Sequence, residues 1–146
     1  MNKQSTSAID PTHFEQFDTE KIKQRDKAHF LHPFQLFDVF EDEGALPIAA
    51  AHDAYIYDSD GNQYLDAVGG LWCTNIGLGR EEMAEAIADQ VRAMAYASPF
   101  VDMTNVPATE LSTKLAQLAP GDLNHVSLSC GGSTAIDTAF RLIQYY

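Results

Sequence analysis

The stretch HVSLSCGGSTAIDTAFR, residues 125–141, decides the fold because it joins three kinds of local structure. Residues 126–128 alternate apolar and polar side chains, as is typical of a short strand. Gly131 and Gly132 follow, and without a Cβ they allow a sharp turn and the close approach of a ligand. From Ser133 onward apolar residues recur at helical spacing, so the stretch predicts a strand, a glycine turn and a helix.

The start of this helix predicts an anion-binding cup. The first N–H groups of a helix have no partner within it, and they lie at the positive end of the helix dipole. A phosphate is the ligand expected there, although many helices begin with Gly-Ser after a strand and bind nothing. The stretch has neither the lysine of a P-loop nor the spacing of the dinucleotide fingerprint.

Length, composition and charge indicate an ordinary globular domain. The chain has 146 residues, 45% of them hydrophobic, which is enough for one core. Its net charge of −12 arises entirely within residues 30–146, since the charges of residues 1–29 cancel. No basic stripe is present, which argues against binding to nucleic acid or to an anionic membrane.

Cysteine usage and the N-terminus favour a cytoplasmic protein. Cys73 and Cys130 are too few and too far apart for a disulfide framework or a zinc site. The first residues contain no apolar segment typical of a secretory signal. No apolar run approaches the length of about 18 residues that spans a membrane.

The N-terminal third is expected to be loosely organised. We expect the first dozen residues to form a loose tail, followed by one short amphipathic helix built on Phe14, Phe17 and Ile22 that docks elsewhere. Pro33 disfavours helix at His32 and ends this region.

The middle of the chain predicts a hairpin and a glycine-rich loop. Residues 54–58 and 63–68 have strand composition and flank an Asp-Gly pair at 60–61, a strong hairpin signal. The loop at residues 69–79 carries Trp72, the only tryptophan. Such a loop is either a packed turn or the wall of a ligand site.

Two helices precede the cup, at residues 81–95 and 107–119, each with an apolar stripe. The order helix, helix, strand, glycine turn, helix indicates an α/β domain with a largely parallel sheet. Because the last helix reaches Tyr146 without a cap, we expect the chain to be the first third of a larger protein.

Several segments, in this order, together resemble one family. They are His32-Pro33-Phe34, the hairpin turn at 57–62, Gly70-Leu71-Trp72-Cys73, residues 77–82, residues 119–126 and the glycine–serine cup. From about His32 to Tyr146 the chain resembles the N-terminal part of the class III (omega) aminotransferases, which are fold-type I pyridoxal-phosphate enzymes.

The resemblance implies an α/β fold in which an antiparallel hairpin segment precedes the start of a mainly parallel sheet. It implies an N-terminal extension at residues 1–31, the beginning of the small domain with its hairpin at 32–80, and an incomplete large cofactor-binding domain at 81–146.

The resemblance also implies how a cofactor is held. In such enzymes the turn that matches Gly131, Gly132, Ser133 and Thr134 grips the phosphate of pyridoxal 5'-phosphate. Gly132 and Ser133 match the family pattern, whereas Thr134 stands where the family usually has Glu. The substrate pocket is expected to include Phe34, Leu71, Trp72 and Phe100 and to be built across a homodimer interface.

The implied activity moves an amino group from an amine or omega-amino acid to a keto acid such as pyruvate, by a ping-pong mechanism through aldimine and ketimine intermediates. None of the lysines matches the Schiff-base position of the family, which lies beyond Tyr146; these are Lys3, Lys21, Lys23, Lys27 and Lys114. We therefore expect the chain alone to be inactive.

Two alternatives remain open. The chain is either part of such an aminotransferase or an inactive, truncated or partner-binding remnant. A third hypothesis makes Cys130 a nucleophile at a helix N-terminus, where a thiol pKa falls. It requires a base, and His125 lies five residues back along the expected strand.

Overall fold

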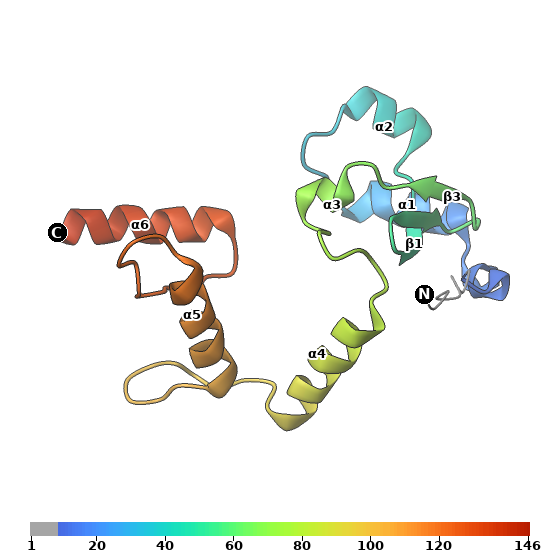
Figure 1. Cartoon of the computed structure of the whole chain (residues 1–146). Coiled ribbons are helices and arrows are strands. Elements are labelled where there is room, and N and C mark those ends of the chain that lie inside the picture. Colours follow the sequence, from blue (N-terminus) through green and yellow to red (C-terminus); the bar gives the residue numbers. More distant parts are fainter. Residues whose placement is uncertain (1–8) are drawn as a thin grey trace. The chain divides into compact units, whose positions relative to one another are not determined.

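The computed structural model describes residues 9–146, which divide into two compact units at Asp89 and Gln90 (Figure 1). We describe each unit by itself. The elements of the first unit, in chain order, are the 3-10 helix η1 (Pro11–Gln16), α1 (Thr19–His29), α2 (Phe37–Glu43), β1 (Ile48–His52), β2 (Tyr55–Asp58), β3 (Gln63–Leu65) and α3 (Gly69–Trp72). Helix α4 (Glu81–Ala93) crosses the division, and the second unit holds α5 (Val106–Leu118) and α6 (Gly132–Tyr145).

The first unit is built on a three-stranded antiparallel sheet of order β1-β2-β3. Its β2–β3 pair is the predicted hairpin, which is confirmed, with Tyr55 opposite Leu65 and Tyr57 opposite Gln63. Strand β1 adds Ala51 opposite Ile56. The sequence did not predict β1, because its run of alanines has no alternating pattern.

The hairpin turn holds Asp58 and Ser59, the only buried residues among those whose burial is described. The Asp58 carboxylate accepts hydrogen bonds from the backbone N–H of Asp60 (3.0 Å) and Asn62 (2.8 Å), the Asn62 amide (2.9 Å) and the Tyr64 hydroxyl (2.8 Å). We call these four residues the Asp58 network. The network stabilises the turn, because hydrogen bonds to an ionised acceptor are stronger than those between neutral groups.

Ser59 connects this turn to helix α1, which runs beside the sheet in Figure 1. Its backbone N–H donates to the carbonyl of Pro47 at 2.8 Å, and its hydroxyl lies 2.7 Å from the Thr19 hydroxyl. The Thr19 hydroxyl also donates to the Asp60 carboxylate. The first residue of α1 is therefore anchored to the turn by polar contacts.

The expected docking is confirmed for Phe14, but the prediction of one helix there is wrong. Phe14 lies 6.1 Å from Tyr57 between ring centroids. Two helical segments form because two aspartates each cap a helix: Asp10 accepts from the N–H of Thr12 (2.9 Å) and Asp18 from that of Lys21 (3.0 Å). Residues 1–8 of the expected tail lie outside the described residues.

Helix α1 ends at His29, and His32 is not helical, as Pro33 predicted. The following segment folds back, so that Nε2 of His32 lies 2.9 Å from the Asp26 carboxylate. The His32 ring contacts Phe30 and Phe40, at centroid distances of 4.4 and 5.3 Å. These contacts give His32 a structural role between α1 and α2.

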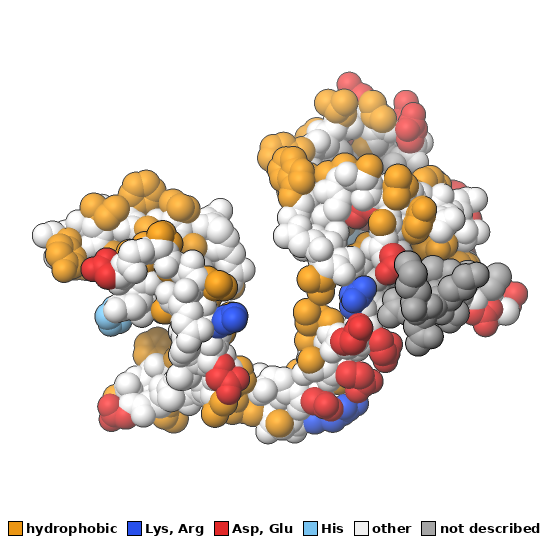
Figure 2. All heavy atoms as spheres, viewed as in Figure 1, with side chains coloured by type: hydrophobic (Ala, Val, Ile, Leu, Met, Phe, Trp, Pro, Cys, Tyr) orange, Lys and Arg blue, Asp and Glu red, His pale blue; other side chains and the backbone are white. Residues whose placement is uncertain are grey.

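In the second unit the predicted helices are confirmed as α5 and α6, but the strand predicted at residues 126–128 is wrong. A strand needs a hydrogen-bonded neighbour, and the described part of the chain pairs no strand with this segment. The apolar stripes of the two helices are exposed (Figure 2); they consist of Leu111, Leu115, Leu118, Ile136, Phe140 and Ile143. Over residues 9–146, no helix has the length and apolar character needed to cross a membrane.

Replacing Asp58 with Ala should destabilise the protein by about 2–4 kcal/mol, because four donors lose a charged acceptor in a buried turn. Tyr64→Phe, which removes one of these donors, should destabilise the protein less than Asp58→Ala does. Urea unfolding measures both. Asp42→Ala is the control, since Asp42 is an exposed carboxylate of α2. Equal midpoints for Asp58→Ala and the control would contradict the role of the network.

The Asp58 network also predicts a pH dependence. Burial by itself raises the pKa of Asp58, but the hydrogen bonds from Asn62, Tyr64 and Asp60 outweigh it and hold this pKa below its ordinary value. The stability gained is present above the unfolded pKa of about 3.9 and is lost as the pH falls through the lower folded pKa. The stability difference between the wild type and Asp58→Asn should therefore shrink on acidification. A difference independent of pH would argue against this assignment.

Candidate cofactor and substrate site

The predicted cup lies at the N-terminus of α6. The helix begins at Gly132, and the Gly131 carbonyl accepts the first helical bond from the N–H of Ala135 at 3.0 Å. The N–H groups of Gly132, Ser133 and Thr134 therefore have no acceptor within the helix. Within the described residues the Ser133 hydroxyl has no hydrogen-bond partner, and no atom lies within 4 Å of where a Cβ on Gly131 or Gly132 would stand.

This arrangement fits a phosphate group. Three backbone N–H groups and the Ser133 hydroxyl lie in the first turn of a helix of 14 residues, at its positive end, and the space beside the glycines is open. The structure thus gives the local geometry that a phosphate requires, while the role of these residues as a cofactor site remains a prediction.

Thr134 contributes to the shape of the cup. Its hydroxyl donates to the Gly131 carbonyl at 2.7 Å, and this carbonyl also accepts the first helical bond and a longer bond from the Ser129 hydroxyl at 3.3 Å. The hydroxyl of Thr134 is thereby turned toward the protein's own backbone, and its N–H remains directed along the first turn of the helix.

The cysteine hypothesis has no base in the described structure. The Cys130 thiol lies 3.9 Å from the Thr134 hydroxyl, and no hydrogen bond joins it to His125 within residues 9–146. His125 is exposed in the segment that was expected to be a strand.

The expected pocket residues Leu71 and Trp72 lie in a left-handed turn. Four consecutive residues have positive φ: Gly69 (59°), Gly70 (58°), Leu71 (62°) and Trp72 (68°). The N–H of Trp72 donates to the Val68 carbonyl, and that of Cys73 to Gly69, both at 2.9 Å. This is one turn of left-handed helix, which costs about 1–2 kcal/mol for each residue other than glycine.

Side chains hold this turn in place. The Gly70 N–H donates to Oδ2 of Asp66 at 2.7 Å, and the Cys73 thiol donates to the Gly70 carbonyl at 2.8 Å. The turn leaves Leu71 68% exposed and Trp72 81% exposed. It therefore presents two apolar side chains to the outside of the first unit.

The other two expected pocket residues also lie at unusual backbone. Phe34 has a φ of 57°, and Phe100 directly precedes Val101, whose φ is 60°. In the described chain only five residues other than glycine have positive φ, and all except Asp53 belong to or adjoin the expected pocket. Strained backbone concentrates at functional sites. The positive φ values at Phe34 and Val101 could not be predicted from the sequence, because phenylalanine and valine do not favour this conformation.

The expected site residues are distributed over both units. Phe34, Leu71 and Trp72 belong to the first unit, where no described hydrogen bond or ring contact joins Phe34 to the other two. Phe100 and residues 131–134 belong to the second unit. Their assembly into one site therefore remains a prediction.

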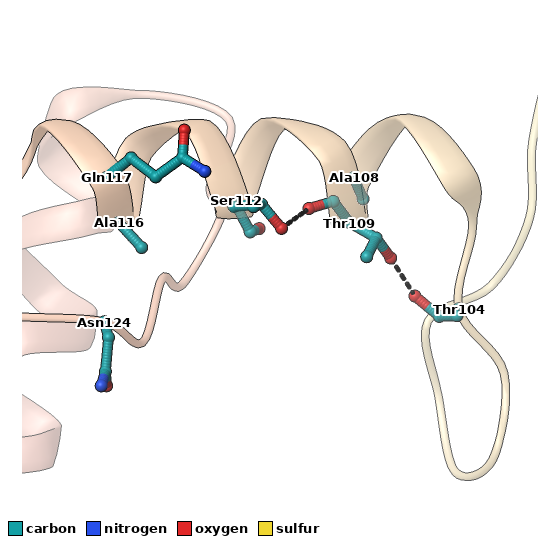
Figure 3. Close-up of a pocket in the computed structure, with 8 residues that line it drawn as sticks. Thr104, Ala108, Thr109, Ser112, Ala116, Gln117 and Asn124 are labelled. Carbon is teal, nitrogen blue, oxygen red and sulfur yellow. Dashed lines mark hydrogen bonds between the residues drawn. The ribbon is translucent and has the colours of Figure 1, made fainter.

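A hollow along α5 lies apart from the predicted residues. Its lining carries small polar side chains and no ionisable group, as Figure 3 shows; it consists of Thr104, Ala108, Thr109, Ser112, Thr113, Ala116, Gln117 and Asn124. The hydroxyls of Thr104 and Thr109 bond each other at 3.2 Å, and that of Thr113 bonds the Thr109 carbonyl. The hollow is lined by no ionisable side chain, and the hydroxyls of its three threonines are engaged in hydrogen bonds.

Two curated aminotransferases are similar to this chain in sequence. The chain is 36% identical over all its 146 residues to the putrescine–pyruvate aminotransferase of Pseudomonas aeruginosa, of which it covers 30%. It is 31% identical over 128 residues to the adenosylmethionine-8-amino-7-oxononanoate aminotransferase of Staphylococcus aureus, covering 28% of that protein.

Solved structures of omega transaminases are similar to this chain in fold. An (S)-enantioselective omega-transaminase from Thermomicrobium roseum superposes with a TM-score of 0.85 at 35% identity, over 89% of this chain and 29% of that one. The omega transaminase of Pseudomonas jessenii, in complex with PMP, gives 0.81 at 27% identity, over 85% of this chain and 27% of that one.

The fold is thus that of the N-terminal part of the fold-type I transaminases, an α/β class, and the expected fold class is confirmed. The family described as aminotransferase class-III matches residues 37–146, and the chain belongs to this family. The chain spans about 30% of the length of the curated relatives that it matches.

The left-handed turn predicts a difference between two neighbouring glycines. A Cβ on Gly70 would lie 2.6 Å from Cγ2 of Thr74, whereas one on Gly69 would lie 3.5 Å from the Thr74 hydroxyl. Gly69→Ala should cost about 1–2 kcal/mol from its positive φ alone, and Gly70→Ala should cost more because the clash is added. Thermal unfolding with near-ultraviolet circular dichroism of Trp72 measures both. An equal cost for the two would show that Thr74 does not constrain the turn.

Proposed function

We propose that these residues form the N-terminal part of a pyridoxal-phosphate-dependent transaminase. Its reaction transfers an amino group from an amine or omega-amino acid to a keto acid such as pyruvate. The proposal is supported by the family match and by relatives named as putrescine–pyruvate aminotransferase and omega-transaminase. As expected from the resemblance, we propose that the full-length protein is a cytoplasmic homodimer.

The observation that carries the proposal is the open cup at α6. Gly131, Gly132 and Ser133 would hold the phosphate of pyridoxal 5'-phosphate through backbone N–H groups and the Ser133 hydroxyl. When bound, this cofactor supplies the electron sink that lets a proton leave the carbon bearing the amine. Thr134 keeps the first turn in shape through its bond to Gly131.

The apolar side chains of the proposed pocket would determine which amine substrates bind. Phe34, Leu71, Trp72 and Phe100 are all exposed apolar side chains, and pockets for small ligands are lined mainly by such groups. By covering the apolar substituent of the amine, they would exclude water from the reacting carbon.

The reactive lysine of the proposed enzyme would come from outside the described residues. Lys27 donates to the Glu41 carbonyl at 2.6 Å, and Lys114 lies exposed on α5. Neither is part of the cup, and Lys21 and Lys23 belong to α1 with Lys27.

A second candidate is a non-catalytic, partner-binding role. The observation that favours it is the exposure of the apolar stripes of α5 and α6 in the described chain. A test of the full-length protein for alanine formation from pyruvate and putrescine, with added cofactor, separates the two. Alanine formation supports the transaminase, and its absence together with binding of a partner protein supports the second candidate.

Ser133→Ala should weaken cofactor binding by roughly ten- to a hundredfold, because a hydroxyl bond to a charged phosphate contributes about 1.5–3 kcal/mol. Titration of the full-length apoenzyme with pyridoxal phosphate, followed by absorbance, measures it. Ser127→Ala is the matched control, since Ser127 is exposed and its hydroxyl has no hydrogen-bond partner among the described residues. Unchanged affinity in Ser133→Ala would exclude the hydroxyl from the phosphate site.

Trp72→Ala in the full-length enzyme should shift the relative rates for different amines while cofactor occupancy stays the same. The reason is that Trp72 belongs to the exposed turn and not to the cup. Rates for a small and a bulky amine, together with the cofactor absorbance band, measure this. Loss of that band in the variant would show that the assignment is wrong.

A further inference from the structure

Asp66 lies where the sheet ends and the left-handed turn begins. Its N–H donates to the Ala54 carbonyl at 2.8 Å, one residue past the Tyr55–Leu65 pair of the β2–β3 ladder. Its own carbonyl accepts from the N–H of Gly69 at 3.2 Å. The backbone of Asp66 is thus fixed by main-chain bonds, which a change of its side chain leaves in place.

The side chain of Asp66 reaches into the turn. Its Oδ2 accepts the Gly70 N–H at 2.7 Å, a bond between a charged acceptor and a backbone donor. In the next peptide group along the chain, the Cys73 thiol donates to the Gly70 carbonyl at 2.8 Å. Both polar groups of Gly70 are therefore held by side chains, with Asp66 connecting the turn to the sheet.

The direction of Trp72 follows from this backbone. Within the described residues the indole has no ring contact and no hydrogen bond, and Trp72 is 81% exposed. Leu71 and Trp72 have φ values of 62° and 68°, a conformation that residues with a Cβ adopt only when their surroundings impose it. The bonds around Gly70 impose it here.

We propose that Asp66 is a positioning residue that, through Gly70, sets how Leu71 and Trp72 meet the apolar substituent of the amine. The inference rests on the proposed function. Asp66 acts through the backbone of the turn, so its loss affects the choice among amines and leaves the cup at residues 131–134 unchanged.

The test uses the full-length protein with Asp66→Ala, Asp66→Asn, Trp72→Ala and the double variant Asp66→Ala/Trp72→Ala. Asp42→Ala, an exposed carboxylate on α2, is the control. The readout is the ratio of kcat/KM for a bulky and a small amine. Asp66→Ala should change this ratio by roughly tenfold, as misplaced substrate-contacting groups do. Asp66→Asn, which keeps an acceptor oxygen, should change it less.

The double variant shows whether the two residues act together. If Asp66 acts through the turn that carries Leu71 and Trp72, the ratio in the double variant should lie close to that of Trp72→Ala and well short of the product of the two single effects. Independent, multiplying effects would overturn the proposal. So would an Asp66→Ala protein that slows both amines equally while Trp72→Ala shifts their ratio.

A structural readout makes the test independent of activity. Hydrogen exchange over residues 67–75 should be about tenfold faster in Asp66→Ala than in the wild type and in the control. Unchanged exchange would also overturn the proposal. An unshifted ratio in Trp72→Ala, or an inactive wild type, would instead count against the proposed function.

Discussion

The first unit depends on one buried carboxylate. Asp58 accepts four hydrogen bonds within six residues of chain, and the neighbouring Ser59 anchors the start of α1. A short hairpin is only marginally stable by itself. The polar turn stabilises one end of this hairpin. Through Ser59 the same turn also bonds Pro47, directly before β1, and Thr19, the first residue of α1.

The opposite end of the same hairpin carries the strained backbone. Asp66 follows β3, and the left-handed turn begins three residues later. A rigid sheet is a suitable support for such a turn, because strain persists only where the surroundings determine the conformation. Asp58 and Asp66 thus have related roles, because each carboxylate accepts hydrogen bonds from backbone N–H groups of the turn that follows it. These are the N–H groups of Asp60 and Asn62 for Asp58, and that of Gly70 for Asp66.

The parts that could be predicted from sequence are those with a local cause. The hairpin follows from its Asp-Gly turn, the helices α4, α5 and α6 from their apolar spacing, and the cup from two glycines before a helix. The strand at residues 126–128 could not be judged locally, because pairing depends on a distant neighbour. The left-handed Leu71 and Trp72 could not be predicted either, since neither residue type favours a positive φ and the bonds from Asp66 and Cys73 to Gly70 are not visible in the sequence.

The left-handed turn has a consequence for protein engineering. Glycine and asparagine tolerate positive φ far better than β-branched residues do. In a saturation library at Leu71 or Trp72, each substitution would therefore change two properties together, the space available to a ligand and the conformational preference of the backbone. A glycine variant would enlarge that space and lower the conformational cost of the positive φ. A valine variant would enlarge the space but raise this cost. Variants matched in side-chain volume but different in backbone preference would separate these contributions.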